Sequence, residues 1–177
     1  MKNLSFISVR ENALPLLLSS LFALTVVAAN WTLNRYGFVS IGFGLIAPAG
    51  VYWAGLAFGL RDAVHEVGGR SFVLASIAVG GVLSYFIDPA FAIASATAFI
   101  LSEVADLAIY EPLRKKKWWL AVALSNIVGS VVDSLLFLYI AFNSVGGWYD
   151  LAVGKAYMII PAIVLVGAIR HALPRHS

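Results

Sequence analysis

Six long apolar segments constrain the fold of this chain more than any other feature. The chain has 177 residues, of which 61% are hydrophobic and 12% are charged, whereas about 25% of the residues in a soluble domain are charged. A helix needs roughly 20 apolar residues to cross a bilayer. We therefore expect an all-α integral membrane protein, folded as a single domain with a bundle of six transmembrane helices. The predicted spans cover residues 13–33, 42–60, 71–87, 90–110, 118–142 and 151–170.

Basic residues are distributed unevenly between the predicted loops. With both termini in the cytoplasm, ten of the twelve Lys and Arg residues lie on the inner side, and Arg35 and Lys155 lie on the outer side. Cytoplasmic loops of membrane proteins are enriched in Lys and Arg. The bias therefore predicts a multi-pass protein of the inner (cytoplasmic) membrane with both termini inside. We attribute the net charge of +3 to this topology and to contacts with the lipid bilayer, and we expect no binding of nucleic acid.

A polar stripe crosses the fifth predicted span. Spacings of four, three and four residues place four side chains on one helix face: Asn126, Ser130, Asp133 and Phe137. A carboxylate near the bilayer centre costs roughly 2.5–3.5 kcal/mol on insertion scales. Because we expect no Lys or Arg at the depth of Asp133, we interpret this residue as part of a solute or ion site. For Asn126 and Ser130, hydrogen bonding between helices is a sufficient alternative explanation.

Polar residues on two other predicted spans extend this candidate site. Glu103 and Asp106 share a face of the fourth span. Glu103 is the better ligand candidate, because Asp106 is close enough to the helix end to pair with Arg114. Asn30, near the outer end of the first span, has an amide that offers both donors and an acceptor. Capping of the helix end is the alternative role for Asn30.

The segment between the second and third spans holds the densest group of ionisable residues. Asp62, His65 and Glu66 would share a face if the helix continued, and such a triplet can in principle hold a metal. We instead expect a cytoplasmic loop, with its charges satisfied by water, Arg61 and Arg70. This loop would serve as a structural hinge or as a cytoplasmic gate that includes Asp62 and Glu66. No metal or cofactor is expected. The chain has no cysteine and lacks the H-E-x-x-H, G-x-S-x-G and Walker motifs, so we predict that it is not an enzyme.

Several of these segments resemble the vitamin uptake transporter family, whose characterised members are queuosine-precursor transporters. The resemblance runs from about residue 21 to residue 142, and it is most specific where a basic run and two tryptophans precede the polar stripe. The matching stretches are A-A-N ending at Asn30, the segment at Asp62, S-E-V-A-D at 102–106, L-R-K-K-K-W-W-L at 113–120 and S-N-I-V-G-S-V-V-D-S-L-L-F at 125–137.

The resemblance implies a six-helix bundle similar to the substrate-binding subunits of energy-coupling-factor importers. It also implies import of a 7-deazaguanine base such as preQ0, preQ1 or queuine. A carboxylate from Glu103 or Asp133 would then accept hydrogen bonds from the base. Asn30 and Asn126 would meet its carbonyl and ring nitrogens, and an aromatic ring such as that of Phe99, Phe137 or Trp53 would stack on its flat face.

Two other functions fit the same residues. One is a cation or proton channel lined by Glu103 and Asp133, and the other is a structural membrane subunit of an importer complex in which the polar stripe serves helix packing. A monomer and a homodimer are both compatible with the sequence, and so are carriers with and without an ATPase module.

Overall fold

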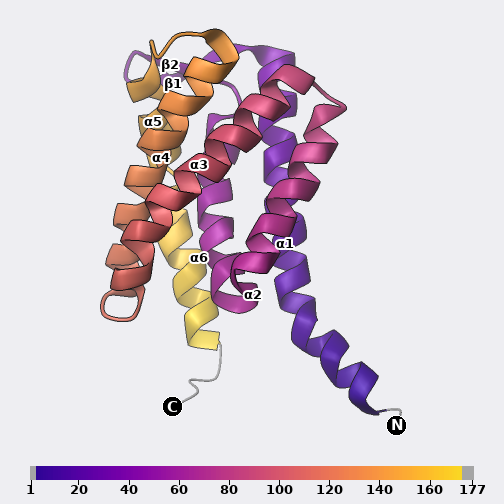
Figure 1. Cartoon of the computed structure of the whole chain (residues 1–177). Helices are drawn as coiled ribbons and strands as arrows, with labels where there is room; N and C mark the ends of the chain where they lie inside the picture. Colours follow the sequence, from indigo (N-terminus) through magenta and orange to yellow (C-terminus); the bar gives the residue numbers. More distant parts are fainter. Residues whose placement is uncertain (1–2, 173–177) are drawn as a thin grey trace.

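The computed structural model describes residues 3–172 of the chain, and most of these residues are helical. Helix α1 (Asn3–Tyr36) leads into a hairpin of β1 (Phe38–Gly42) and β2 (Leu45–Pro48). Five helices follow: α2 (Val51–Tyr85), α3 (Pro89–Arg114), α4 (Trp118–Phe142), α5 (Trp148–Ala156) and α6 (Ile159–Ala172). The helices form one bundle, with the hairpin at the end opposite the start of α1 and the end of α6 (Figure 1).

The described residues contain five helical segments that are long and apolar enough to cross a membrane. The fold is therefore a helical, multi-pass membrane protein, as predicted. The segments are Ala13–Tyr36, Val51–Tyr85, Pro89–Asp106, Trp118–Phe142 and Trp148–Ala172.

Helix α2 contains both the second and the third predicted span. Its path is interrupted at Gly69, where φ is 73° and ψ is −173°, a conformation that essentially only glycine adopts. The chain runs away from the hairpin through the first half of α2 and returns through the second half (Figure 1). The structure thus has five apolar segments where we predicted six spans, because two of the predicted spans belong to one sharply kinked helix.

The predicted second span begins too early. Residues 42–48, which we expected in a helix, belong to the hairpin, in which β1 and β2 pair antiparallel. Three successive residues with positive φ, Gly42, Phe43 and Gly44, form the turn. Two of the three are glycines, which adopt positive φ at little cost. The helix itself begins at Val51.

The last three predicted spans agree better with the structure. Residues 90–110 lie within α3, and residues 118–142 coincide with α4. The predicted span 151–170 is divided between α5 and α6. Pro161 explains the division, because a proline has no N–H to donate and its ring clashes with the carbonyl four residues earlier. That carbonyl belongs to Tyr157, in the break between the two helices.

Two glycines of α2 allow α5 and α6 to approach it closely. A Cβ atom at Gly55 would lie 2.7 Å from the carbonyl oxygen of Lys155, and a Cβ atom at Gly59 would lie 2.6 Å from the Cβ atom of Ala162. Small residues commonly permit such close backbone contacts between membrane helices. The backbone of α5 is therefore held against α2 at position 155.

Asp88 connects the start of α3 to the end of α1. Its carboxylate accepts hydrogen bonds from the backbone N–H of Phe91 at 3.1 Å and from the side-chain amide of Asn34 at 3.0 Å.

We expect Asp88→Ala to lower the free energy of unfolding by about 1 kcal/mol, because an alanine cannot cap the helix. Thermal unfolding of the purified protein in detergent measures this. Asp88→Asn is the control, since asparagine caps nearly as well; equal melting temperatures for wild type and Asp88→Ala would contradict the expectation.

Candidate functional site

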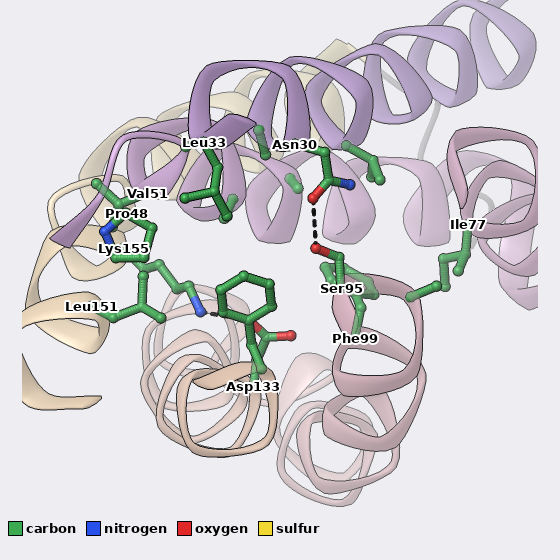
Figure 2. A pocket seen from close by; sticks show the side chains of 17 residues that line it. Asn30, Leu33, Pro48, Val51, Ile77, Ser95, Phe99, Asp133, Leu151 and Lys155 are labelled. Carbon is green, nitrogen blue, oxygen red and sulfur yellow. Dashed lines mark hydrogen bonds and ion pairs between the residues drawn. The ribbon is translucent and has the colours of Figure 1, made fainter. Parts of the chain in front are cut away.

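A pocket lies inside the bundle, next to the hairpin, where five helices meet (Figure 2). The space within it that is open to the centres of water-sized molecules is about 70 Å³, smaller than the roughly 300–1,000 Å³ of typical small-molecule sites. Most of the wall is apolar and includes Leu33, Val51, Ile77, Phe99, Phe137 and Leu151. Four polar or charged side chains interrupt it: Asn30, Ser95, Asp133 and Lys155. A mostly apolar wall with a few polar groups is typical of a ligand site.

Asn30 contributes an unused hydrogen-bond donor to the pocket. Its side-chain oxygen accepts from the hydroxyl of Ser95 at 2.8 Å, which joins α1 to α3 (Figure 2). Its amide nitrogen is buried and has no partner among the described residues. A buried donor left without a partner costs roughly 1–3 kcal/mol. A ligand with an acceptor at this position would remove that cost.

Asp133 lies on the opposite wall and forms an ion pair with Lys155. The Lys155 Nζ atom is 2.5 Å from Asp133 Oδ2 and 3.0 Å from Ser134 Oγ. Our prediction placed Lys155 in an outer loop and no basic residue at the depth of Asp133, and both statements were wrong. The loop ends at Gly147 and α5 re-enters the bundle, so Lys155 is only 3% exposed. A charged side chain can be buried in this way when it is paired and hydrogen-bonded.

A second buried polar cluster surrounds Arg61, farther from the hairpin. The guanidinium lies 3.1 Å from a carboxylate oxygen of Asp62, 3.3 Å from one of Glu103, and forms a hydrogen bond with Asp106. Asn126 donates to the other oxygen of Asp62 at 2.8 Å. The cluster therefore joins α2, α3 and α4. The predicted cytoplasmic loop at Asp62 was wrong, because α2 continues through it and the residue is fully buried.

The seven predicted substrate-binding residues thus do not lie in one site. Asn30, Asp133 and Phe137 line the pocket. Ser130 is buried and donates a long hydrogen bond of 3.4 Å to the carbonyl oxygen of Ala152 in α5. The other three lie in the cluster around Arg61: Glu103, Asp106 and Asn126.

The sequence could have indicated the basic residues that pair with the buried acids. Asp106 pairs with Arg61, where we had offered Arg114 as its alternative partner. Buried carboxylates require counter-charges, and Arg61 and Lys155 both occur in or beside apolar segments of the sequence. The predicted loop positions of these two residues left the buried acids without the basic partners that they have in the structure.

Glu66, the other predicted gate residue, belongs to a polar network at the end of the bundle remote from the hairpin. Its carboxylate is 2.9 Å from Arg170 in α6 and 4.0 Å from Arg114, and it accepts a hydrogen bond of 2.6 Å from Tyr110 in α3. His65 instead lies 3.6 Å from Glu111. Among the residues that the structure describes, no group of three or more His, Cys, Asp or Glu side chains is arranged to hold a metal ion.

Together these features define a multi-pass membrane protein with a mostly apolar pocket inside its helix bundle. Residues 82–169, from the second half of α2 to α6, match the model of a family described as putative vitamin uptake transporter. The predicted resemblance to the vitamin uptake transporter family is therefore confirmed, over about half of the chain.

One curated relative is the queuosine precursor transporter of Escherichia coli (strain K12). It is 40% identical to this chain over 52 residues, which make up 29% of this chain and 24% of the relative. The aligned segment thus spans about a quarter of the relative's length. No solved structure matches the chain, so the similarity to substrate-binding subunits of energy-coupling-factor importers stays a prediction.

Arg61 provides a test of the buried cluster. We expect Arg61→Met to lower the free energy of unfolding by about 3–5 kcal/mol, because the substitution leaves buried carboxylates without their counter-charge. Thermal unfolding in detergent measures the loss. Arg70→Met is the matched control: Arg70 pairs with Glu111 at 3.0 Å, but its side chain is 63% exposed, and such surface pairs contribute roughly 0–1 kcal/mol. If both variants melted at the same temperature, the cluster would have no special structural role.

Proposed function

We propose that this protein imports a queuosine precursor, a 7-deazaguanine base such as preQ0, preQ1 or queuine, across the inner membrane. The observation that carries the proposal is the pocket, in which the unpartnered amide nitrogen of Asn30 and the carboxylate of Asp133 stand on opposite apolar walls. The family match and the name of the E. coli relative support the same class of solute.

The chemistry of such a base complements the pocket. A 7-deazaguanine has N–H donors beside a carbonyl acceptor on one edge, and it has a flat aromatic face. The carboxylate of Asp133 can accept from N–H groups, and the amide nitrogen of Asn30 can donate to a carbonyl. Phe99 and Phe137 provide rings in the apolar wall, where stacking or edge contacts with a planar ligand are favourable.

The arrangement of the bundle supports uptake from the outer side. The turn between the two halves of α2, the basic loop between α3 and α4, the start of α1 and the end of α6 all lie at the end remote from the hairpin (Figure 1). Basic residues favour the cytoplasm for that end, and this supports the proposed topology with both termini inside. The pocket includes Pro48 and Gly50 beside the hairpin, so it lies toward the outside. In this topology, the cluster that contains Asp62 lies on the cytoplasmic side of the pocket and forms the inner gate.

A channel lined by Glu103 and Asp133 is less well supported. Asp133 faces the pocket and is paired with Lys155, whereas Glu103 is paired with Arg61 and is absent from the pocket lining. The two acids therefore do not line one common path within the described residues. A purely structural role would also leave the unpartnered donor of Asn30 without a purpose.

Binding of bases to the purified protein tests the proposal. A ligand at a hundredfold its Kd stabilises a protein by about 2.7 kcal/mol, so at least one of preQ0, preQ1 and queuine should raise the melting temperature by several degrees, and guanine serves for comparison. We expect Asp133→Asn to lose this shift. Asn34→Leu is the control, because Asn34 is a polar residue that contacts Asp88 outside the pocket lining. If no base shifts the folded wild-type protein, the proposal is rejected.

A further inference from the structure

The cluster around Arg61 contains more acids than bases. Among the described residues, the carboxylates of Asp62, Glu103 and Asp106 all contact this one guanidinium. Both aspartates and Arg61 are fully buried, and Glu103 is 7% exposed. With all three acids ionised, the cluster would hold two negative charges in excess. A buried acid without a full counter-charge is costly to ionise, and it can instead become neutral by binding a proton.

Several atoms of the cluster also lack a hydrogen-bond partner. Glu103 Oε2, Asp106 Oδ1 and Arg61 Nη2 are buried without one among the described residues. A proton would turn one carboxylate oxygen into an O–H donor, which a neighbouring carboxylate can accept. A metal cation fits less well, because the guanidinium contacts all three acids and no described group of three acids is arranged to hold a metal.

Glu103 is the acid best placed to take this proton. Asp62 accepts a hydrogen bond from Asn126 at 2.8 Å, and Asp106 accepts one from Arg61. Both aspartates would weaken these bonds by taking a proton. Glu103 Oε2 lies 3.3 Å from Arg61 Nε, but neither atom has a hydrogen-bond partner among the described residues. Glu103 therefore gives up the least when it becomes neutral.

The charged and titratable groups around Glu103 come from α2 and from its own helix: Arg61, Asp62, Asp106 and, farther along α2, His65 and Arg70. On α4, the neutral amide of Asn126 joins the cluster. The groups farther toward the cytoplasmic end have contacts elsewhere: His65 and Arg70 with Glu111, and Arg170 of α6 with Glu66. The charge on Glu103 thus acts mainly on Arg61, and a proton on Glu103 weakens one of the contacts that tie α2 to α3.

The cluster directly adjoins the pocket. Ala57 of α2 and Phe99 of α3 line the pocket, and Arg61 and Glu103 each follow four residues later, which is about one helical turn. In the proposed topology, Glu103 lies one turn from the pocket toward the cytoplasm, at the inner gate. A solute in the pocket and a proton on Glu103 are then close enough for each to alter the binding of the other.

We propose that Glu103 is a proton-binding site and that the protein imports its base together with a proton. This inference rests on the proposed function and adds its energy source. The carboxylate takes up a proton from the outer side and becomes a carboxylic acid, so its attraction to Arg61 weakens and the inner gate loosens. The base and the proton then leave to the cytoplasm, and the ionised Glu103 restores its contact with Arg61.

Transport into liposomes tests the coupling with the wild-type protein alone. Valinomycin and equal potassium on both sides hold the membrane potential at zero, and radiolabelled preQ0, preQ1 and queuine are supplied in separate experiments. With an outer pH about one unit below the inner pH, one proton per base supports roughly tenfold accumulation of the base, because tenfold corresponds to about 1.4 kcal/mol. The dye pyranine inside the liposomes should report acidification as the base enters. A sodium gradient without a pH gradient should produce no accumulation.

Glu103→Gln then identifies the acid. Glutamine has nearly the same shape but cannot bind the proton, so accumulation and acidification should be lost. Binding of the base in detergent, and exchange of labelled for unlabelled base across the membrane, should persist. Glu111→Gln is the matched control: Glu111 is another glutamate of α3, but it contacts His65 and Arg70 outside the cluster. This variant should accumulate the base as the wild type does.

The outcomes separate the two proposals. If the folded wild type neither binds nor exchanges any of the three bases, the proposed function fails. If it exchanges a base that a pH gradient does not accumulate, or that a sodium gradient does, proton coupling is overturned and the function stands. Accumulation that Glu103→Gln leaves unchanged would overturn the assignment to Glu103. Loss of binding and exchange in the same variant would also overturn it, since Glu103 would then be needed for the base itself.

Discussion

Compensation of charge inside the helix bundle is the constraint on which the rest of this structure depends. Arg61 lies fully buried in α2 and contacts carboxylates of its own helix and of α3, while Asn126 of α4 donates to one of those carboxylates. A guanidinium has five N–H donors in a fixed planar arrangement, so one arginine can contact several acids at once. Since an unpaired buried charge is strongly destabilising, sliding any of the three helices along another would be costly. The cluster thus fixes their relative positions.

Polar contacts at both ends of the bundle complement this central cluster. On the hairpin side, Asn34 of α1 donates to Asp88 at the start of α3. At the opposite end, Glu66 of α2 contacts Arg170 of α6 and accepts from Tyr110 of α3. Lipid provides no hydrophobic force between apolar helices, so packing and hydrogen bonds must hold a membrane bundle together. The pocket is therefore enclosed by helices that are tied together above and below it.

The sequence predicted the parts of this fold that follow from local patterns. The bounds of α4 and the shared helix face of Asn126 and Asp133 follow from apolar length and helical spacing, and both residues are buried as expected. The hairpin at β1 and β2 was missed because its residues are apolar enough to pass for the start of a span. The kink at Gly69 left two predicted spans within one helix.

The errors at the site have a different cause, since they concern contacts between distant segments. Arg61 and Lys155 were assigned to loops because isolated basic residues usually lie outside the membrane. Their actual positions depend on where α2 and α5 pass the acids of α3 and α4, which no spacing within one segment reveals. The requirement that each buried carboxylate have a counter-charge would have identified both residues, although it could not have decided which base pairs with which acid.

Both buried polar sites contain side-chain atoms without a hydrogen-bond partner among the described residues: Arg61 Nη2 and Asp106 Oδ1 in the cluster, and the amide nitrogen of Asn30 in the pocket. The two sites differ in what they hold together. The carboxylates around Arg61 share one cation and tie three helices together, so a ligand that displaced them would destabilise the bundle. In the pocket, the ion pair of Asp133 and Lys155 satisfies itself, while the amide nitrogen of Asn30 has no partner among the described residues. An unsatisfied buried donor costs roughly 1–3 kcal/mol. The empty pocket carries this cost, and a bound solute with a suitable acceptor removes it. The fold can tolerate that cost because its stability rests on the other contacts, and under the proposed function its removal would contribute to the affinity for the solute.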